Sequence, residues 1–301
     1  MGSIAARSFG TIPCTAFYAG AMPTKPPPEG FALHLQKAQA DHIAGRLDEA
    51  AESYAAVLMQ DGRNLPAHLG MGILSLQKGE ACEAETQLRR ALRLNPRAAT
   101  VHLHLAAAMR IQDRASEALM HVQFHESLRP GSPEGALELA LIQVALGEDE
   151  IALAVAVQWA EAHPKAPEGG LNLGRVYQAL GRLGEARACF EVVLTQNPDH
   201  QEALGLQVST LVGLGAFTET FRALLTYEAA SPGDPSTGDL LAQVVVLLAG
   251  EAERATEPMI QALTRGRVDA ARSATAGWVS DLSKAAEVWT ALVAEAPAKP
   301  H

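Results

Sequence analysis

A spacing of 34 residues runs through most of the chain and constrains its fold more than any other feature. Prolines, alanines and glycines each recur on this spacing, and one aspartate fills the single gap in the glycine series. The residues are Pro96, Pro130, Pro164, Pro198 and Pro232; Ala50, Ala84, Ala118, Ala152 and Ala186; and Gly45, Gly79, Asp113, Gly147, Gly181 and Gly215. Such self-similarity indicates a repeat protein in which each copy is one structural unit.

Each copy predicts a pair of helices. In residues 167–200, the apolar period of LNLGRVYQAL indicates a first helix. Gly181 then supplies a turn, because glycine adopts the left-handed conformation at a helix end at little cost. A second helix follows, with the small Ala186 where the two helices cross and Phe190 on the same face. Pro198 ends the copy, since proline cannot continue a helix.

This pattern resembles the tetratricopeptide repeat (TPR) family. The resemblance is carried by the period, a small residue at repeat position 8, alanine at position 20, a bulky residue at position 24 and proline at position 32. Position 8 is Ala38, Gly72, Ala106, Ala140 and Gly174, and position 24 is Tyr54, Leu88, Val122 and Phe190. The resemblance implies an all-α fold, an α-solenoid in which antiparallel helix pairs form a right-handed superhelix with the first helices on the concave side.

Six repeats cover about two-thirds of the chain, and some depart from the family pattern. The repeats are 31–64, 65–98, 99–132, 133–166, 167–200 and 201–234. Gly62 replaces the first proline, and Ala156 at position 24 leaves space that Trp159 would fill. Val208 and Thr220 replace the small residues of the sixth repeat, which predicts looser helix packing there. Residues 1–30 are expected to form a disordered, Pro-rich leader, and residues 235–301 degenerate repeat-like helices that cap the stack.

The resemblance also indicates which residues face the concave groove. In the family these are positions 2, 5, 9, 12 and 13, and position 5 here is leucine in five successive repeats. The predicted partner-binding residues are Leu35, Gln39, His42, Leu69, Ile73, Leu76, Leu103, Arg110, Leu137, Leu141, Val144, Leu171, Arg175 and Gln178. This row predicts an apolar strip too large for a monomer to leave exposed.

Three interpretations of the strip remain open. A partner segment, either an amphipathic helix or an apolar peptide, would cover it. Alternatively, the leader, the tail or a second copy of the chain would do so, or close packing of the repeats would bury the leucines. Glu134, Glu168 and Glu202 at position 2 suit an acidic ladder for a basic partner, or simply the starts of helices, where Pro133 and Pro167 also fit.

Composition excludes several classes of function. The net charge is −10 and no basic surplus or patch stands out, so we expect neither nucleic acid nor anionic membrane as partner. The apolar run 240–249 is about half the ~20 residues of a membrane span, and the N-terminus is a poor signal peptide. Cys14, Cys82 and Cys189 lie too far apart for a zinc motif or a disulfide framework. We therefore expect a cytoplasmic protein.

No enzyme motif is present in the sequence. The chain has no phosphate loop, nucleophile elbow, HExxH or CxxC, so we expect no catalysis and no cofactor. His34, His68 and His102 share position 4, where they would pack between helices. His121 and His125 lie four residues apart and could chelate a metal, which makes metal binding a lesser alternative.

These features favour a non-catalytic scaffold, such as an adaptor, a co-chaperone or an assembly factor, that binds a protein partner in the groove. The groove lacks the lysines and asparagines with which some TPR modules hold a chaperone C-terminus, so that ligand is not expected. The alternative is an accessory subunit of a separate transferase or of a secretion-type complex. A homo-oligomer is also compatible with the apolar row.

Overall fold

A computed structural model describes residues 29–230 of the chain, and the regular secondary structure of these residues is all helix, with no strand. The helices are α1 (Glu29–Ile43), α2 (Leu47–Gln60), α3 (Leu65–Gln77), α4 (Ala81–Leu94), α5 (Ala99–Ile111), α6 (Ala115–Leu128), α7 (Pro133–Ala145), α8 (Asp149–Ala162), α9 (Pro167–Ala179), α10 (Leu183–Gln196), α11 (Gln201–Gly213) and α12 (Phe217–Ala230). Odd-numbered helices are the first helices of the repeats and even-numbered helices the second. The predicted all-α solenoid of helix pairs is confirmed. The expected leader, apart from the start of α1, and the expected capping tail lie outside the described residues.

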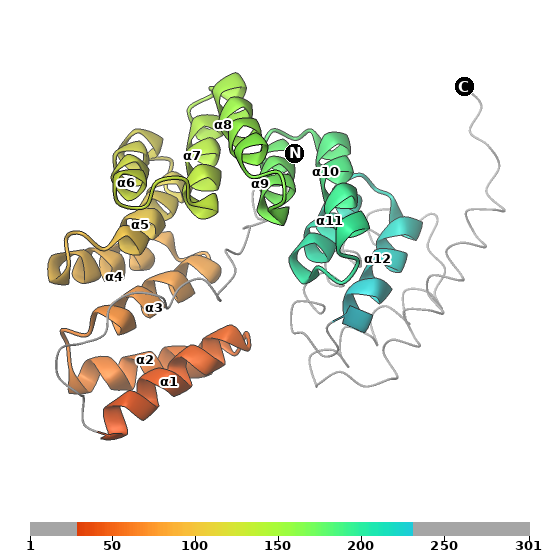
Figure 1. Ribbon diagram of the computed structural model, residues 1–301. Helices are drawn as coiled ribbons and strands as arrows, with labels where there is room; N and C mark the ends of the chain where they lie inside the picture. The colour runs from red at the N-terminus through yellow and green to blue at the C-terminus, as the bar shows by residue number, and fades with distance from the viewer. Residues whose placement is uncertain (1–28, 231–301) are drawn as a thin grey trace, which may run out of the picture. The chain divides into compact units, whose positions relative to one another are not determined.

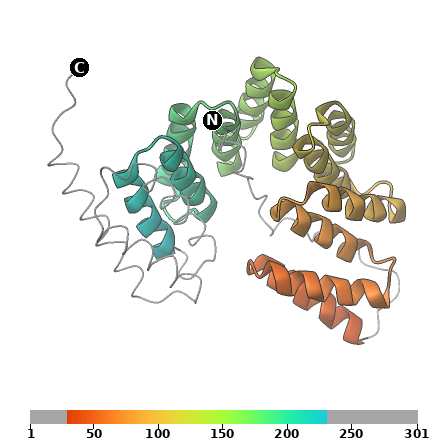
Figure 2. The same cartoon turned by 180° about the vertical axis from the view of Figure 1, so that it is seen from behind.

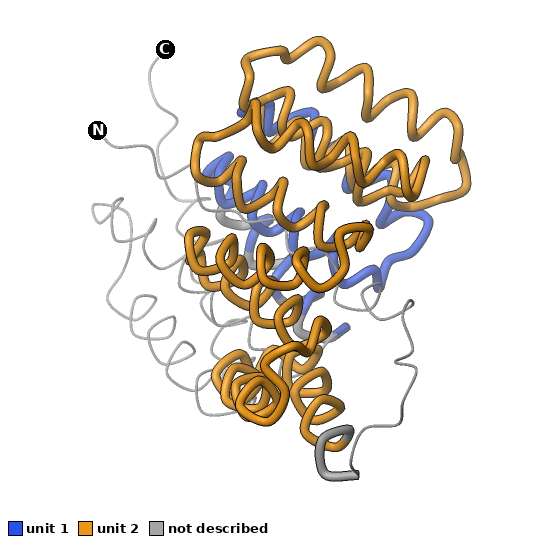
Figure 3. Tube along the Cα trace, turned by 90° about the vertical axis from the view of Figure 1, so that its left-hand side faces the viewer, with its two compact units in different colours: residues 1–8, 181–301 blue, residues 9–180 orange. Residues whose placement is uncertain are grey.

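The chain divides into two compact units (Figure 3). Unit 2, residues 9–180, contains α1–α9, and unit 1, residues 1–8 and 181–301, contains α10–α12. Within unit 2 the helices stack in chain order (Figures 1 and 2). Each second helix packs on the first helix of its own repeat and on that of the next repeat. Successive first helices also contact one another, from α1 to α9, so they form one continuous layer. In unit 1, α11 packs against both α10 and α12.

The turns between the paired helices follow the predicted glycine series. Gly45, Gly79, Gly147, Gly181 and Gly215 all have positive φ, between 68° and 79°. Asp113, which fills the gap in the series, also has a positive φ of 59°. This left-handed conformation is cheap for glycine, and aspartate is one of the few other residues that tolerate it.

Local sequence also explains where the first helices begin. Asn64 caps α3 by accepting a hydrogen bond from the Ala67 N–H, and Ser132 caps α7 by accepting one from the Gly135 N–H. Pro133 and Pro167 occupy the first positions of α7 and α9, as predicted, where the missing N–H has no intrahelical partner to lose.

Small residues sit where the helices cross. The position-20 alanines Ala50, Ala84, Ala118, Ala152 and Ala186 are completely buried. A Cβ added to Gly72, at position 8, would lie 2.6 Å from Cγ of the fully buried Leu88. The sequence series therefore marks close helix contacts rather than helix propensity alone.

Two repeats depart from this pattern as the sequence suggested. Trp159, near the small Ala156, is only 9% exposed, and its Nε1–H donates to the Gly131 carbonyl at 3.0 Å. In the sixth repeat, Val208 and Thr220 are both completely buried. Looser packing of that repeat stays a prediction.

Candidate functional site

The position-5 leucine row is buried by the repeats themselves. Leu69, Leu103, Leu137 and Leu171 are 8%, 3%, 6% and 3% exposed, and Leu35 is half-buried. Leu69 lies in the same core cluster as residues of α5, and Leu137 lies in the same cluster as Val176 of α9, so neighbouring repeats contribute to their burial. The expectation of an exposed apolar strip along five repeats is therefore wrong. Close packing, the third interpretation, accounts for these leucines.

A different row of residues on the first helices remains partly exposed. Leu76, Arg110, Val144 and Gln178 stand at position 12 of four successive repeats, and each is half-buried. We call these four residues the position-12 row. Among the other predicted groove residues, Gln39 and Leu141 are half-buried, whereas His42, Ile73 and Arg175 are buried.

Arg110 of this row is held by a carboxylate of the next repeat. Its Nε and Nη2 donate to the two carboxylate oxygens of Glu138 at 2.7 and 3.2 Å, which joins α5 to α7. Burial lowers the pKa of Arg110, but the adjacent Glu138 carboxylate raises it more, so the net pKa lies above the ordinary value. Sequence reasoning missed Glu138, although a glutamate inside the apolar run LELALIQV was a signal that it has a partner.

His42 joins the first two repeats and does not point to a ligand. Its Nε2 lies 2.9 Å from Oε1 of Gln77 on α3, and its Nδ1 lies 3.4 Å from the Tyr54 hydroxyl. Burial lowers the pKa of His42 more than the hydrogen bond to Gln77 raises it. The neutral ring therefore donates to Gln77 and accepts from Tyr54, and His42 is a structural residue rather than a groove contact.

Two of the position-4 histidines, His68 and His102, bind α3 and α5 to the preceding loop and to the second helix of the same repeat. His68 Nε2 lies 3.1 Å from the Gly62 carbonyl, and His102 Nε2 lies 2.9 Å from the Pro96 carbonyl, in each case six residues back in the preceding loop. The Nδ1 atoms reach the second helix of the same repeat, to Gln87 at 2.9 Å and to His121 at 2.9 Å. All of these pairings recur at the 34-residue spacing.

The histidines predicted as a chelating pair are separated in function. His125 is 1% exposed; its Nδ1 lies 3.0 Å from the Ala99 carbonyl and its Nε2 lies 2.8 Å from the Ser132 hydroxyl. Since Ser132 also caps α7, His125 completes a hydrogen-bonded helix start. His121 instead faces His102. Metal binding through His121 and His125 would break these contacts, and no group of three or more potential ligands gathers within the described residues.

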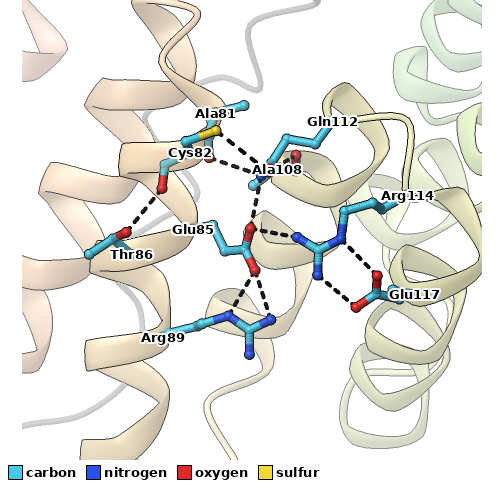
Figure 4. Close-up of polar contacts among 9 residues, drawn as sticks. All are labelled: Ala81, Cys82, Glu85, Thr86, Arg89, Ala108, Gln112, Arg114 and Glu117. Carbon is cyan, nitrogen blue, oxygen red and sulfur yellow. Dashed lines mark hydrogen bonds and ion pairs between the residues drawn. The ribbon is translucent and has the colours of Figure 1, made fainter.

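A polar network joins the second and third repeats (Figure 4). Glu85 accepts hydrogen bonds from Arg89, Gln112 and Arg114, and Arg114 also binds Glu117 through two nitrogens. Burial raises the pKa of Glu85, but these three donors together lower it below its ordinary value. The network fixes α4 against the α5–α6 turn and leaves its charges paired.

A separate open groove lies within unit 1, among α10, α11 and α12. Its volume is about 330 Å³, and the walls are mainly apolar, with Leu194, Leu204 and Leu211 among the lining residues. Its carboxylate, Glu219, is paired with Arg187 at 2.8 Å.

Across the described residues, no helix is both long and apolar enough to cross a bilayer.

Comparisons with known proteins agree with this architecture. Residues 42–108 and 171–235 match two tetratricopeptide repeat family models. A crystal structure of a thermophilic TPR protein from Thermus thermophilus has a TM-score of 0.53 at 22% identity, covering 61% of this chain and 98% of that one. A structure of the APC/C hetero-tetramer Cut9-Hcn1 has a TM-score of 0.50 at 17% identity, covering 71% of this chain and 42% of that one. No curated protein matches.

Proposed function

The chain is a tetratricopeptide repeat protein and hence a protein–protein interaction scaffold, and we propose that the face of its first helices holds one segment of a protein partner. The observation that carries this proposal is the position-12 row. It offers an accessible apolar or polar side chain in each of four repeats that stand in direct contact. The buried leucines of the same helices hold this face in place, so little ordering of the scaffold itself is needed on binding.

The partner segment would be an amphipathic helix or an extended apolar peptide. Leu76, Leu141 and Val144 would contact its apolar side chains, while Gln39 and Gln178 would contact polar groups. Arg110 is already bound to Glu138, so it would contribute mainly by packing of the paired side chains against the segment and less by a new ion pair. We infer a non-catalytic scaffold, and in support His42, His68, His102 and His125 of unit 2 form structural hydrogen bonds.

The test is a double variant that makes the accessible row polar. Leu76→Gln with Val144→Gln should weaken partner capture at least tenfold while helical content is unchanged. Glutamate at Leu103 or Leu137 is unsuitable, since a charge at those buried positions would destabilise the fold. The matched control is Met120→Gln with Ile151→Gln, the same kind of change at exposed positions on second helices.

Crosslinking the captured partner and mapping the crosslinks by mass spectrometry identifies both the segment and the surface. Crosslinks should fall on the odd-numbered helices and disappear in the double variant but not in the control. A partner that crosslinks to the second helices, or that the double variant retains, would contradict the proposal. An enzyme or a secretion subunit among the captured partners would identify the chain as an accessory subunit, the alternative expected from sequence.

A further inference from the structure

Three successive loops at one edge of unit 2 each carry an exposed arginine. Each loop joins the second helix of a repeat to the first helix of the next, and they contain Arg63, Arg97 and Arg129. Arg90 and Arg93 add two more exposed guanidinium groups from the last two turns of α4. We call these five arginines the basic edge. The fold places at one edge of unit 2 arginines that lie apart in the sequence.

The five guanidinium groups have no partner within the described part of the chain. None of them forms an ion pair or a side-chain hydrogen bond with any residue between 29 and 230. Two carboxylates near these loops, Asp61 and Glu126, accept instead from the backbone N–H groups of Arg63 and Gly131. Unit 2 therefore presents five exposed arginines that form no ion pair, in a chain whose net charge is −10.

Basic residues at the opposite edge of the same helices are paired with carboxylates. There the turns within each repeat carry Arg46, Lys78 and Arg114, and every one of these is paired with a carboxylate. The pairs are Arg46–Asp41 and Lys78–Asp48, both at 2.6 Å, and Arg114–Glu85 at 2.7 Å with Arg114–Glu117 at 2.6 Å. The basic residues of these turns are therefore neutralised, in contrast to those of the loops between repeats.

Helix dipoles explain one member of the basic edge but not the set. Arg93 lies in the last turn of α4, where a cation stabilises the helix. Arg63 and Arg97 instead directly precede the N-termini of α3 and α5, where positive charge is unfavourable. Those two helices have no acidic residue in their first turn, whereas α7 and α9 have Glu134 and Glu168 there. Positive helix ends thus add to the arginines at this edge.

We propose that the basic edge binds an acidic segment of a protein partner, at a surface distinct from the first-helix face. A peptide suits the surface because Met59, 89% exposed in the last turn of α2, offers an apolar contact beside the arginines. A nucleic acid suits it less, since the three loops have no phenylalanine, tyrosine or tryptophan on which bases could stack. A long polyanion or an anionic bilayer would also extend over surfaces that are negative on balance.

The probe is a fluorescent peptide of about twelve residues, which spans roughly 40 Å when extended. It carries glutamates interspersed with serine and one leucine, and its control has glutamine at each glutamate. We expect the acidic peptide to bind, to bind more weakly as salt is raised, and to lose about tenfold in affinity in the triple variant Arg63→Gln, Arg93→Gln and Arg97→Gln. The glutamine peptide should not bind.

The matched control removes three positive charges elsewhere: Lys37→Gln, Lys78→Gln and Arg182→Gln, all at exposed residues. It should bind the acidic peptide as the native chain does. An equal loss in both triple variants, or no loss in either, overturns the proposal. Tighter binding of a single-stranded oligonucleotide or of phosphatidylserine vesicles, abolished by the first variant, would overturn the assignment of a protein partner. The position-12 row is intact in both variants, so failure here is distinguishable from failure of the first-helix proposal.

Discussion

His102 and His121 face each other across α5 and α6 with their Nδ1 atoms 2.9 Å apart, so one ring must donate an Nδ1–H to the Nδ1 of the other. His102 Nε2 donates to the Pro96 carbonyl, which leaves its Nδ1 as an acceptor in the neutral ring. His121 must then donate through its own Nδ1–H. A proton on every nitrogen of this pair would place two N–H groups head to head.

The first prediction concerns the pKa of His121. Burial, the charge of His102 and that of Arg89 lower this pKa from 6.5, while Glu117 and Glu85 raise it by less. In an NMR titration of the ring, His121 should titrate below 6.5. Arg89→Gln should raise its pKa, because one nearby positive charge is removed, whereas Arg93→Gln should not. A His121 that titrates above 6.5 in the native chain would contradict the arrangement.

The second prediction concerns acid sensitivity of the fold. His104 is 1% exposed, and burial, then the charges of His125 and His42, lower its pKa from 6.5 to about 3. Between those values the unfolded chain binds a proton that the folded chain does not, so stability is complete above pH 6.5 and falls as pH decreases toward 3. The slope is about 1.4 kcal/mol per pH unit from this residue.

Urea unfolding at pH 7.5, 6 and 5 measures this slope. His104→Leu should remove the contribution of His104 and flatten the dependence below pH 6.5, whatever its effect at pH 7.5. An unchanged slope in the variant would show that other groups cause the acid sensitivity.

The third prediction tests the close helix crossing at position 8. Gly72→Ala should lower the free energy of unfolding by about 1–3 kcal/mol, because its Cβ would lie 2.6 Å from Cγ of the fully buried Leu88. Gly205→Ala is the matched control within α11. The nearest atom to its Cβ is Cε2 of Tyr227 at 3.4 Å, an ordinary contact. That variant should be neutral or gain up to about 1 kcal/mol from helix propensity. Equal effects of both changes would argue against a packing constraint.

The fold was predictable because its determinants are local and repeat. Gly79, Ala84 and Pro96 mark the turn, the crossing and the end of one repeat, and the same letters recur in the next copies. The candidate site was less predictable because exposure depends on neighbouring repeats. Leu103 has the position of a groove residue, yet it is only 3% exposed in the packed repeats. The basic edge escaped notice because whether an arginine such as Arg97 is paired depends on tertiary structure.

The fourth prediction concerns the left-handed turn at Asp113, where φ is 59°. Asp113→Gly should leave stability unchanged or raise it by up to about 1 kcal/mol, since glycine adopts this conformation without a steric penalty. Asp113→Val should lower it by about 1–2 kcal/mol, because a β-branched side chain is strained there. Thermal unfolding of the two variants distinguishes backbone strain from a surface-charge effect, which would move both in the same direction.

The fifth prediction concerns the ion pair between Arg110 and Glu138. The Glu138 side chain is 4% exposed and that of Arg110 is 23% exposed, so Arg110→Met would leave a carboxylate buried without its cation. That single change should cost about 2–4 kcal/mol, somewhat less than for a fully buried pair because Arg110 is partly solvated. The double variant Arg110→Met with Glu138→Leu removes both charges and should recover most of the loss. Denaturant unfolding of all four chains completes a double-mutant cycle. If the double variant is as unstable as the sum of the single variants, the pair does not couple α5 to α7.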